Sequence, residues 1–122
     1  MMQVAGGCHC RAIRYVADVD EDAQLIDCNC SICAMAGYLH LIVPTHRFRL
    51  LSGKEALIEY RFGTGRARHL FCRICGIKSF YRPRSHPDGI SLNARCLDGG
   101  VPPLPVRTFD GRNWEAAIAG LP

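Results

Sequence analysis

Three cysteines stand within six residues in the segment Cys28-Asn29-Cys30-Ser31-Ile32-Cys33. Thiolates are soft ligands, and three of them at this spacing can hold one zinc ion while its fourth tetrahedral position stays free. A zinc with a free position can bind water or an incoming thiol, and it keeps such a thiol deprotonated near neutral pH although a free thiol has a pKa of about 8.5. The spacing therefore predicts a reactive metal site, with Cys28, Cys30 and Cys33 as catalytic residues and as ligands of a zinc.

Four other cysteines form two close pairs, Cys8-His9-Cys10 and Cys72-Arg73-Ile74-Cys75, about sixty residues apart. Four thiolates make a closed zinc site of the structural kind, which can contribute on the order of 10 kcal/mol to folding. We therefore expect Cys8, Cys10, Cys72 and Cys75 to hold a structural zinc, and the chain to bind two Zn²⁺. Spacing alone leaves open the alternative that Cys28 or Cys33 replaces one of these four.

A fourth protein ligand would close the second site and remove its reactivity. The candidates in the sequence are Cys96, His40, His9 and His69. An isolated cysteine such as Cys96, which follows an alternating strand pattern, is more often a small buried hydrophobic residue than a ligand. The open and the closed site both remain consistent with the spacing.

Composition indicates a mainly β domain. The chain has 122 residues, the length of one domain, so we expect residues 1–122 to form a single unit. Twelve Gly and seven Pro divide it into short apolar runs, a pattern typical of many short strands. With no apolar stretch long enough to span a membrane and no signal-peptide pattern, we expect a soluble, cytoplasmic protein, in which cysteines are metal ligands or reactive thiols more often than disulfides.

The basic charge balance is weak evidence for nucleic-acid binding. The formal net charge is +4 and the pI about 8.7, but the arginines are interleaved with apolar residues and do not form a run. Seven thiolates with two Zn²⁺ would add a charge of about −3, which brings the metal-loaded protein near neutrality. Nucleic acid is therefore not an expected partner.

Several short segments would position the cysteines. We expect Cys8 and Cys10 to lie on a strand, where alternate residues share a face, and Gly76 to adopt positive φ in the turn after Cys75. The expected strands are Arg11–Ala17, Gln24–Asp27, Tyr38–Val43, Phe48–Leu51, Leu57–Phe62, Arg68–Phe71, Ser79–Arg82, Ile90–Arg95 and Val106–Phe109. A small-residue turn at Ala34–Gly37, which can hold a helical turn, and a C-terminal helix at Trp114–Ala119, capped by Asp110 or Asn113, complete the elements.

Four cysteine-containing motifs together resemble the glutathione-dependent formaldehyde-activating enzyme family. They are Gly-Gly-Cys-His-Cys at 6–10, Cys-Asn-Cys-Ser-Ile-Cys at 28–33, Phe-Cys-Arg-Ile-Cys-Gly at 71–76 and Asn-Ala-Arg-Cys-Leu-Asp at 93–98. Within that family, residues 80–85 and 39–44 look like the zinc domain of centromere protein V. The resemblance extends over about residues 6 to 116.

The resemblance implies a compact Mss4-like zinc-binding β fold and the same division of cysteines into a structural and a catalytic set. It also implies a carbon–sulfur lyase-type activity, the reversible joining of the glutathione thiol to formaldehyde. Arg82 or Arg84 could then hold a carboxylate of the substrate. The alternative function is a non-catalytic zinc module that binds a protein or nucleic acid and has a closed second site.

Overall fold

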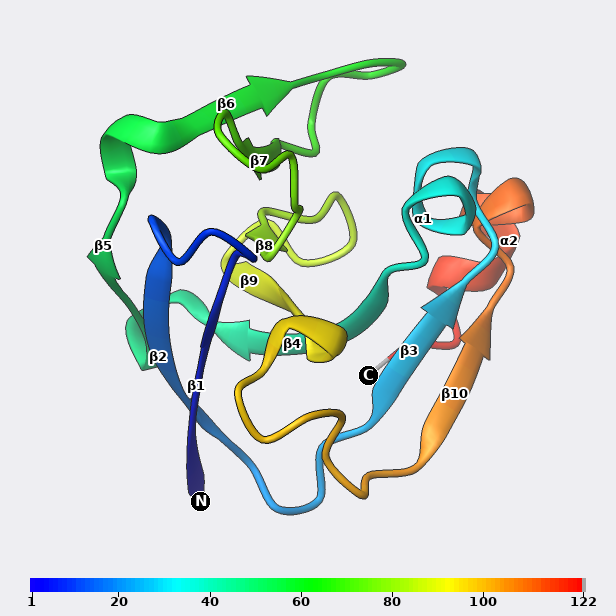
Figure 1. The fold of residues 1–122 in the computed structure, drawn as a ribbon. Helices are drawn as coiled ribbons and strands as arrows, with labels where there is room; N and C mark the ends of the chain where they lie inside the picture. Colours follow the sequence, from blue (N-terminus) through cyan, green and yellow to red (C-terminus); the bar gives the residue numbers. More distant parts are fainter. Residues whose placement is uncertain (122) are drawn as a thin grey trace.

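The computed structural model describes residues 1–121, which contain ten short strands and two short α-helices (Figure 1). The strands are β1 (Met2–Gly7), β2 (Arg14–Val19), β3 (Leu25–Cys28), β4 (Leu39–Pro44), β5 (Phe48–Ser52), β6 (Leu57–Tyr60), β7 (His69–Cys72), β8 (Phe80–Tyr81), β9 (Gly89–Asn93) and β10 (Val106–Phe109). The helices are α1 (Ser31–Ala36) and α2 (Trp114–Ile118), with 3₁₀ turns at Thr45–Arg47, Lys54–Ala56, Ala94–Cys96 and Gly111–Asn113. The expected mainly β fold with a short C-terminal helix is confirmed.

The strands form three sheets. The first has the order β1-β2-β5, the second β10-β3-β4-β9-β8, and the third pairs β6 with β7. In the second sheet β10 runs parallel to β3, with Phe109 opposite Cys28, although more than half of the chain separates the two strands. Both strands run toward α1 and α2, which lie at the same end of the sheet (Figure 1). The end of the chain is thereby placed beside the three-cysteine segment.

Two buried clusters stabilise this arrangement. The larger one lies between the first and second sheets and includes Tyr15, Leu41 and Leu92, all fully buried. The smaller one consists of Cys33, Tyr38 and Tyr81, with Cys28 and Cys30 packed against it. The three-cysteine segment is thus outside the main core, on a separate cluster of its own.

The expected strands are present, most of them with shifted ends, and two expectations need correction. Cys8 and Cys10 lie in the turn between β1 and β2, not on a strand, because β1 ends at Gly7. The small-residue segment at Ala34–Gly37 does hold a helical turn, the end of helix α1, which Gly37 ends with φ of 63°. Asn113 is at the N-cap of α2, but its side chain donates to Asp110 and makes no capping bond.

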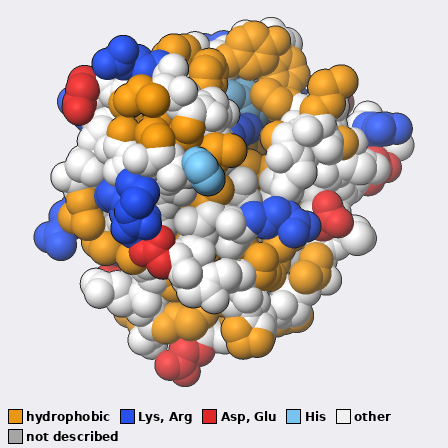
Figure 2. All heavy atoms as spheres, viewed as in Figure 1, with side chains coloured by type: hydrophobic (Ala, Val, Ile, Leu, Met, Phe, Trp, Pro, Cys, Tyr) orange, Lys and Arg blue, Asp and Glu red, His pale blue; other side chains and the backbone are white. Residues whose placement is uncertain are grey.

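The basic side chains on the surface are dispersed, in agreement with their interleaving with apolar residues in the sequence. On the face seen in Figure 2, Lys and Arg side chains are scattered among hydrophobic and neutral groups. Within residues 1–121, no helix is both long and apolar enough to cross a membrane.

Candidate functional site

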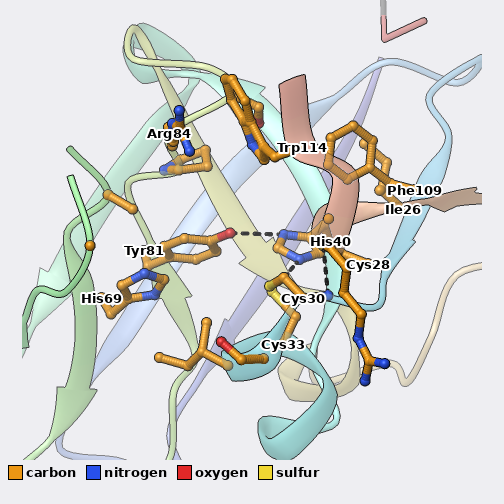
Figure 3. Close-up of a pocket in the computed structure, with 18 of the residues that line it drawn as sticks. Ile26, Cys28, Cys30, Cys33, His40, His69, Tyr81, Arg84, Phe109 and Trp114 are labelled. Carbon is orange, nitrogen blue, oxygen red and sulfur yellow. Dashed lines mark hydrogen bonds between the residues drawn. The ribbon is translucent and has the colours of Figure 1, made fainter. Parts of the chain in front are cut away.

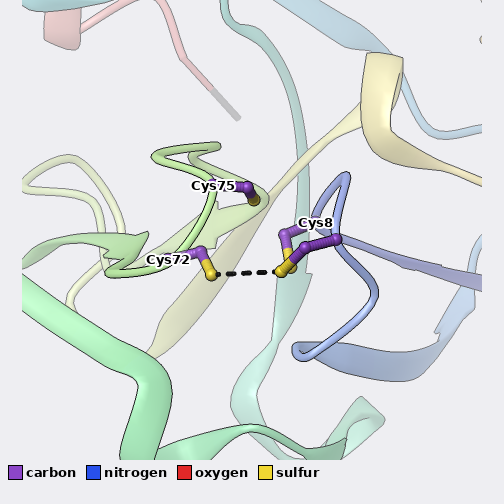
Figure 4. Close-up of side chains that lie close together, drawn as sticks. Cys8, Cys72 and Cys75 are labelled. Carbon is purple, nitrogen blue, oxygen red and sulfur yellow. Dashed lines mark hydrogen bonds between the residues drawn. The ribbon is translucent and has the colours of Figure 1, made fainter.

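The structure brings Cys8, Cys10, Cys72 and Cys75 together, with all four sulfurs within 4.8 Å of one another (Figure 4). The Cys10 sulfur lies 3.6 Å from that of Cys8 and 3.6 Å from that of Cys72, which is 62 residues away. Two sulfurs bound to one tetrahedral zinc at about 2.3 Å are separated by about 3.8 Å. The observed spacing therefore fits a zinc bound by four thiolates.

Backbone amides around this cluster point at its sulfurs. The N–H of Ile13 donates to Cys8 Sγ at 3.3 Å, and that of Ile74 donates to Cys72 Sγ at 3.4 Å. Gly76 has φ of 76°, the left-handed conformation expected for the turn after Cys75. Such donors lower the charge density on thiolate sulfurs, as the ligands of a structural metal require.

Cys28, Cys30 and Cys33 form the second group, and their sulfurs also lie within 4.8 Å of one another. Cys28 ends β3, Cys30 is the N-cap of α1, and Cys33 lies in the first turn of that helix. The strand and helix therefore direct the three thiols to one point, where Cys33 is buried and the other two are half-buried. We call these residues the cysteine trio.

Electrostatics within the trio favour a bound cation. Hydrogen bonds from Cys28 and Cys33 hold the pKa of Cys30 well below its ordinary value. The hydrogen bond with Cys30 raises the pKa of Cys28, and hydrogen bonds with Cys28 and Cys30 raise that of Cys33. Three adjacent sulfurs cannot all ionise without a positive charge among them. The donor set thus fits a thiophilic metal ion such as zinc.

His40 holds the trio from inside the protein. Its Nε2 lies 3.2 Å from Cys33 Sγ (Figure 3). Its Nδ1 lies 2.9 Å from the Ser91 hydroxyl. Burial lowers the pKa of His40 to about 3, so the ring is neutral and carries a single N–H. When Ser91 donates to Nδ1, the proton is on Nε2, which donates to the Cys33 sulfur. His40 therefore orients Cys33.

None of the other candidate fourth ligands reaches the trio. Cys96 lies near the carbonyl oxygen of Lys78, 3.9 Å from its sulfur, and interacts electrostatically with Cys8 and Cys75. His9 is exposed beside the first cluster, and His69 Nδ1 contacts Lys78 at 2.6 Å. Among the described residues, the group of possible ligand atoms that all lie within 4.8 Å of one another here consists of the three sulfurs of the trio. His40 is not in this group, although its Nε2 lies 3.2 Å from Cys33 Sγ.

A cavity of about 430 Å³ opens onto the trio. Its volume falls in the range of about 300 to 1,000 Å³ that is typical of small-molecule sites. Besides the three cysteines, its walls are formed by residues from five other parts of the chain, among them His40, Phe62, His69, Tyr81, Arg84 and Trp114. The trio is therefore accessible to a small molecule, whereas a purely structural metal site needs no such opening.

Tyr81 presents a hydroxyl to this cavity. The hydroxyl lies 3.4 Å from His40 Nδ1, whose lone pair already has a closer partner in Ser91 at 2.9 Å. Burial raises the pKa of Tyr81 well above its ordinary value, so the hydroxyl keeps its proton. Its O–H is thus a hydrogen-bond donor in the cavity wall beside the trio.

Lys78 and His69 pack against Tyr81. The Lys78 Nζ lies 3.9 Å from the centre of the Tyr81 ring, and the His69 ring stacks on Tyr81 with centroids 4.8 Å apart. Burial lowers the pKa of Lys78 to about 8, so the ammonium is still the main form at pH 7 and donates to His69 Nδ1. Burial and this ammonium lower the pKa of His69 to about 4. His69 is therefore a neutral ring in the cavity wall.

Lys78→Met is expected to raise the pKa of His69 from about 4 toward its ordinary value of 6.5, because it removes the second of the two causes. The folded pKa lies below the unfolded one, so His69 contributes stability above pH 6.5 that is lost as the pH falls from 6.5 to about 4. The free energy of unfolding of the variant should therefore fall less than that of the wild type as the pH falls from 6.5 to about 4. An NMR titration of the His69 ring protons measures the pKa directly, with Lys54→Met, the exposed lysine, as control. An unchanged or lower pKa in Lys78→Met would contradict the account.

Gly111 closes one side of the trio, and nothing in the sequence pattern marked it. A Cβ added at this position would lie 2.5 Å from Cys28 Sγ and 2.7 Å from Cys30 Cβ. The parallel pairing of β10 with β3 causes this close approach, since it places the residues after Phe109 against those after Cys28. A glycine is required here for lack of space.

Comparison with known proteins gives two findings. The family model described as glutathione-dependent formaldehyde-activating enzyme matches residues 3–109. A crystal structure of a Rhodobacter sphaeroides protein, a structural genomics target, is 33% identical, with a TM-score of 0.72, and the match covers 84% of this chain and 99% of that one.

Proposed function

Because this chain belongs to the glutathione-dependent formaldehyde-activating enzyme family, we propose that it is a carbon–sulfur lyase-type enzyme that adds a glutathione-like thiol reversibly to formaldehyde or a similar small carbonyl compound. In this reaction the thiol loses its proton, a sulfur–carbon bond forms, and the carbonyl oxygen gains a proton. Family membership supports the general activity in this proposal, the glutathione-dependent activation of formaldehyde.

One observation supports this proposal most strongly. The trio lies in the wall of a cavity of about 430 Å³. Among the described residues, the possible metal-binding group at this place has three ligands, all of them cysteines. We propose that Cys28, Cys30 and Cys33 hold a catalytic zinc, and that Cys8, Cys10, Cys72 and Cys75 hold a structural one. A zinc held by three thiolates lowers the pKa of a thiol in its fourth position and so supplies a nucleophile at neutral pH.

The chain's own residues position the reactants. The hydrogen bond between His40 Nε2 and Cys33 Sγ fixes the orientation of that sulfur, and the cavity walls confine the thiol and the carbonyl compound next to each other. The Tyr81 hydroxyl stays protonated and lines the cavity beside the trio, and we assign it as the donor for the carbonyl oxygen on which negative charge develops. Tyr81 in turn is held by the packing of His69 and Lys78.

The experiment measures the rate of adduct formation between glutathione and formaldehyde by NMR exchange. Metal-loaded wild-type protein is expected to accelerate the exchange, and a Cys30→Ser variant that folds and keeps the other metal is expected not to. Equal rates of adduct formation with the wild type and with Cys30→Ser would exclude the proposed activity and favour a non-catalytic zinc module.

Tyr81→Phe tests the proposed donor. The variant keeps the ring that packs on His69 and Lys78 but lacks the hydroxyl, so we expect the maximal rate of adduct formation to fall roughly 100-fold. Metal content should stay at the wild-type value. Tyr38→Phe is the matched control, because the Tyr38 hydroxyl donates to the Ser91 carbonyl at 2.7 Å and does not line the cavity. A rate within a factor of about two of wild type in Tyr81→Phe would exclude this role.

A further inference from the structure

Arg84 is an unusual cation in the cavity wall. Its guanidinium carbon lies 3.7 Å from the centre of the Trp114 ring, and its Nε is buried without a hydrogen-bond partner. A buried donor of a charged group that lacks a partner is costly, and it indicates that a group absent from the protein itself completes the site. The position of Arg84 therefore points to a ligand.

The charge around Arg84 specifies what kind of ligand. Within residues 1–121, no carboxylate lies within 4.0 Å of its guanidinium, whereas Arg14, Arg47, Arg61 and Arg68 each have an acidic partner. Among the described residues that line the cavity, none is Asp or Glu, and the second cation there is Arg112. The Nε of Arg112 already donates to the Asn29 carbonyl at 3.1 Å. Apart from the trio, the described part of the cavity wall thus carries positive charge without an acidic partner, centred on Arg84.

Trp114 fixes the plane of this cation. Stacking covers one face of the guanidinium and leaves the N–H groups at its edge for hydrogen bonds in the plane of the group. A planar guanidinium held in this way matches a carboxylate, which can accept two parallel N–H bonds. Two segments distant in the chain make the pair, since Arg84 follows β8 and Trp114 begins α2.

Arg82, the other arginine considered from the sequence, is already used within the protein. Its NH1 donates to Thr45 Oγ1 at 3.1 Å and to the Pro87 carbonyl at 3.2 Å, and it does not line the cavity. Arg82 therefore stabilises the turn after β8, and Arg84 is the arginine available to a ligand.

We propose that Arg84, stacked on Trp114, binds a carboxylate of the thiol substrate and makes the site select thiols that carry a carboxylate over neutral thiols. In Figure 3 the Arg84–Trp114 pair lies on the opposite side of His40 and Tyr81 from Cys30 and Cys33. A substrate that contacts both carries its thiol and its carboxylate on different parts of the molecule, as a small peptide thiol does. This inference rests on the proposed function and adds the residue that selects the substrate within it.

The test uses the single Trp of the chain as reporter. S-methylglutathione is the probe, because its thioether sulfur cannot ionise and binding then reports the rest of the molecule. With metal-loaded wild-type protein, we expect a saturable change in Trp114 fluorescence. The dimethyl ester of S-methylglutathione should bind about 10- to 100-fold more weakly, the range for loss of one charge-assisted hydrogen-bonded pair. Equal affinities for the acid and the ester would overturn the proposal without any mutation.

Variants of Arg84 give a second readout by calorimetry. Arg84→Met should weaken binding of S-methylglutathione by about 10- to 100-fold. Arg84→Lys should have an affinity between those of the wild type and Arg84→Met, since lysine keeps the charge and loses the planar fork. Arg49→Met, which removes an exposed arginine outside the cavity, is the matched control. Affinities of Arg84→Met and the control that agree within a factor of about two would contradict the assignment.

Kinetics separate this inference from the proposed function. In Arg84→Met the KM for glutathione should rise while that for 2-mercaptoethanol stays unchanged. Acceleration of adduct formation with unchanged KM values would exclude the subsite and keep the function. Arg84-dependent binding of S-methylglutathione without acceleration by the wild type would keep the subsite and exclude the function.

Discussion

The Cys8→Ser chain is expected to be unfolded at 25 °C even with excess zinc. A structural zinc with four thiolates can contribute on the order of 10 kcal/mol, and a small domain is stable by only about 5–15 kcal/mol in total. Cys8 is 5% exposed, and the cluster links the β1–β2 turn to the end of β7 across 62 residues. Loss of one ligand therefore removes a long-range connection that the modest core cannot replace.

Cys30→Ser is the matched comparison, because it removes one thiol from the other cluster. The trio spans six residues, so a metal there connects β3 to the adjacent α1 and to little else. We expect Cys30→Ser to fold, with one zinc per chain. Circular dichroism with metal analysis distinguishes the two variants. Similar unfolding in both would show that the division into a structural and a reactive cluster is wrong.

Gly111→Ala is expected to abolish binding of the second metal and to reduce the rate of adduct formation by roughly 100-fold or more. The added methyl would lie 2.5 Å from Cys28 Sγ and 3.1 Å from the Cys30 backbone nitrogen, so the segment after β10 must move away from the trio. Overpacking of this kind costs about 1–3 kcal/mol, which the first cluster and the core can tolerate. The variant should therefore fold with one zinc.

Gly99→Ala is the control for this substitution. A Cβ at Gly99 would meet nothing within 4 Å, and Gly99, like Gly111, has no positive φ, so alanine suits the backbone at both positions. Metal analysis should give two zinc for Gly99→Ala and one for Gly111→Ala. Two zinc in Gly111→Ala, with wild-type activity, would contradict the placement of β10 against the trio.

Much of the fold followed from local signals in the sequence. Pro44, Gly37 and Gly53 end elements where a proline or a left-handed glycine must, and the strand at Val106–Phe109 has the expected bounds. The two sets of cysteines also come together as the spacing suggested, because each pair or trio is local and only one long-range contact is needed to join the pairs. Cys8 and Cys10 converge from a turn and not from a strand, since a chain reversal can direct two thiols to one point equally well.

The cavity could not be predicted in this way. Its walls depend on the parallel pairing of β10 with β3, which carries Gly111 and Trp114 to the trio, and no local pattern encodes that pairing.

The role of His40 could not be predicted from the sequence either. A histidine on an apolar strand is usually a hydrogen-bonded core residue, and only the tertiary structure shows that one of its partners is Cys33. The sequence offered Arg82 and Arg84 as equals, and the contacts of Arg82 separate them.

X-ray absorption at the zinc edge measures whether the trio holds a zinc with a free position for the substrate thiol. Wild-type protein with two zinc per chain should show an average of about 3.5 sulfur ligands per zinc, rising to about 4 when glutathione is added. Cys30→Ser, with one zinc, should show about 4 and no response to glutathione. An average of four protein ligands at both wild-type sites before glutathione, with no change after it, would contradict the account.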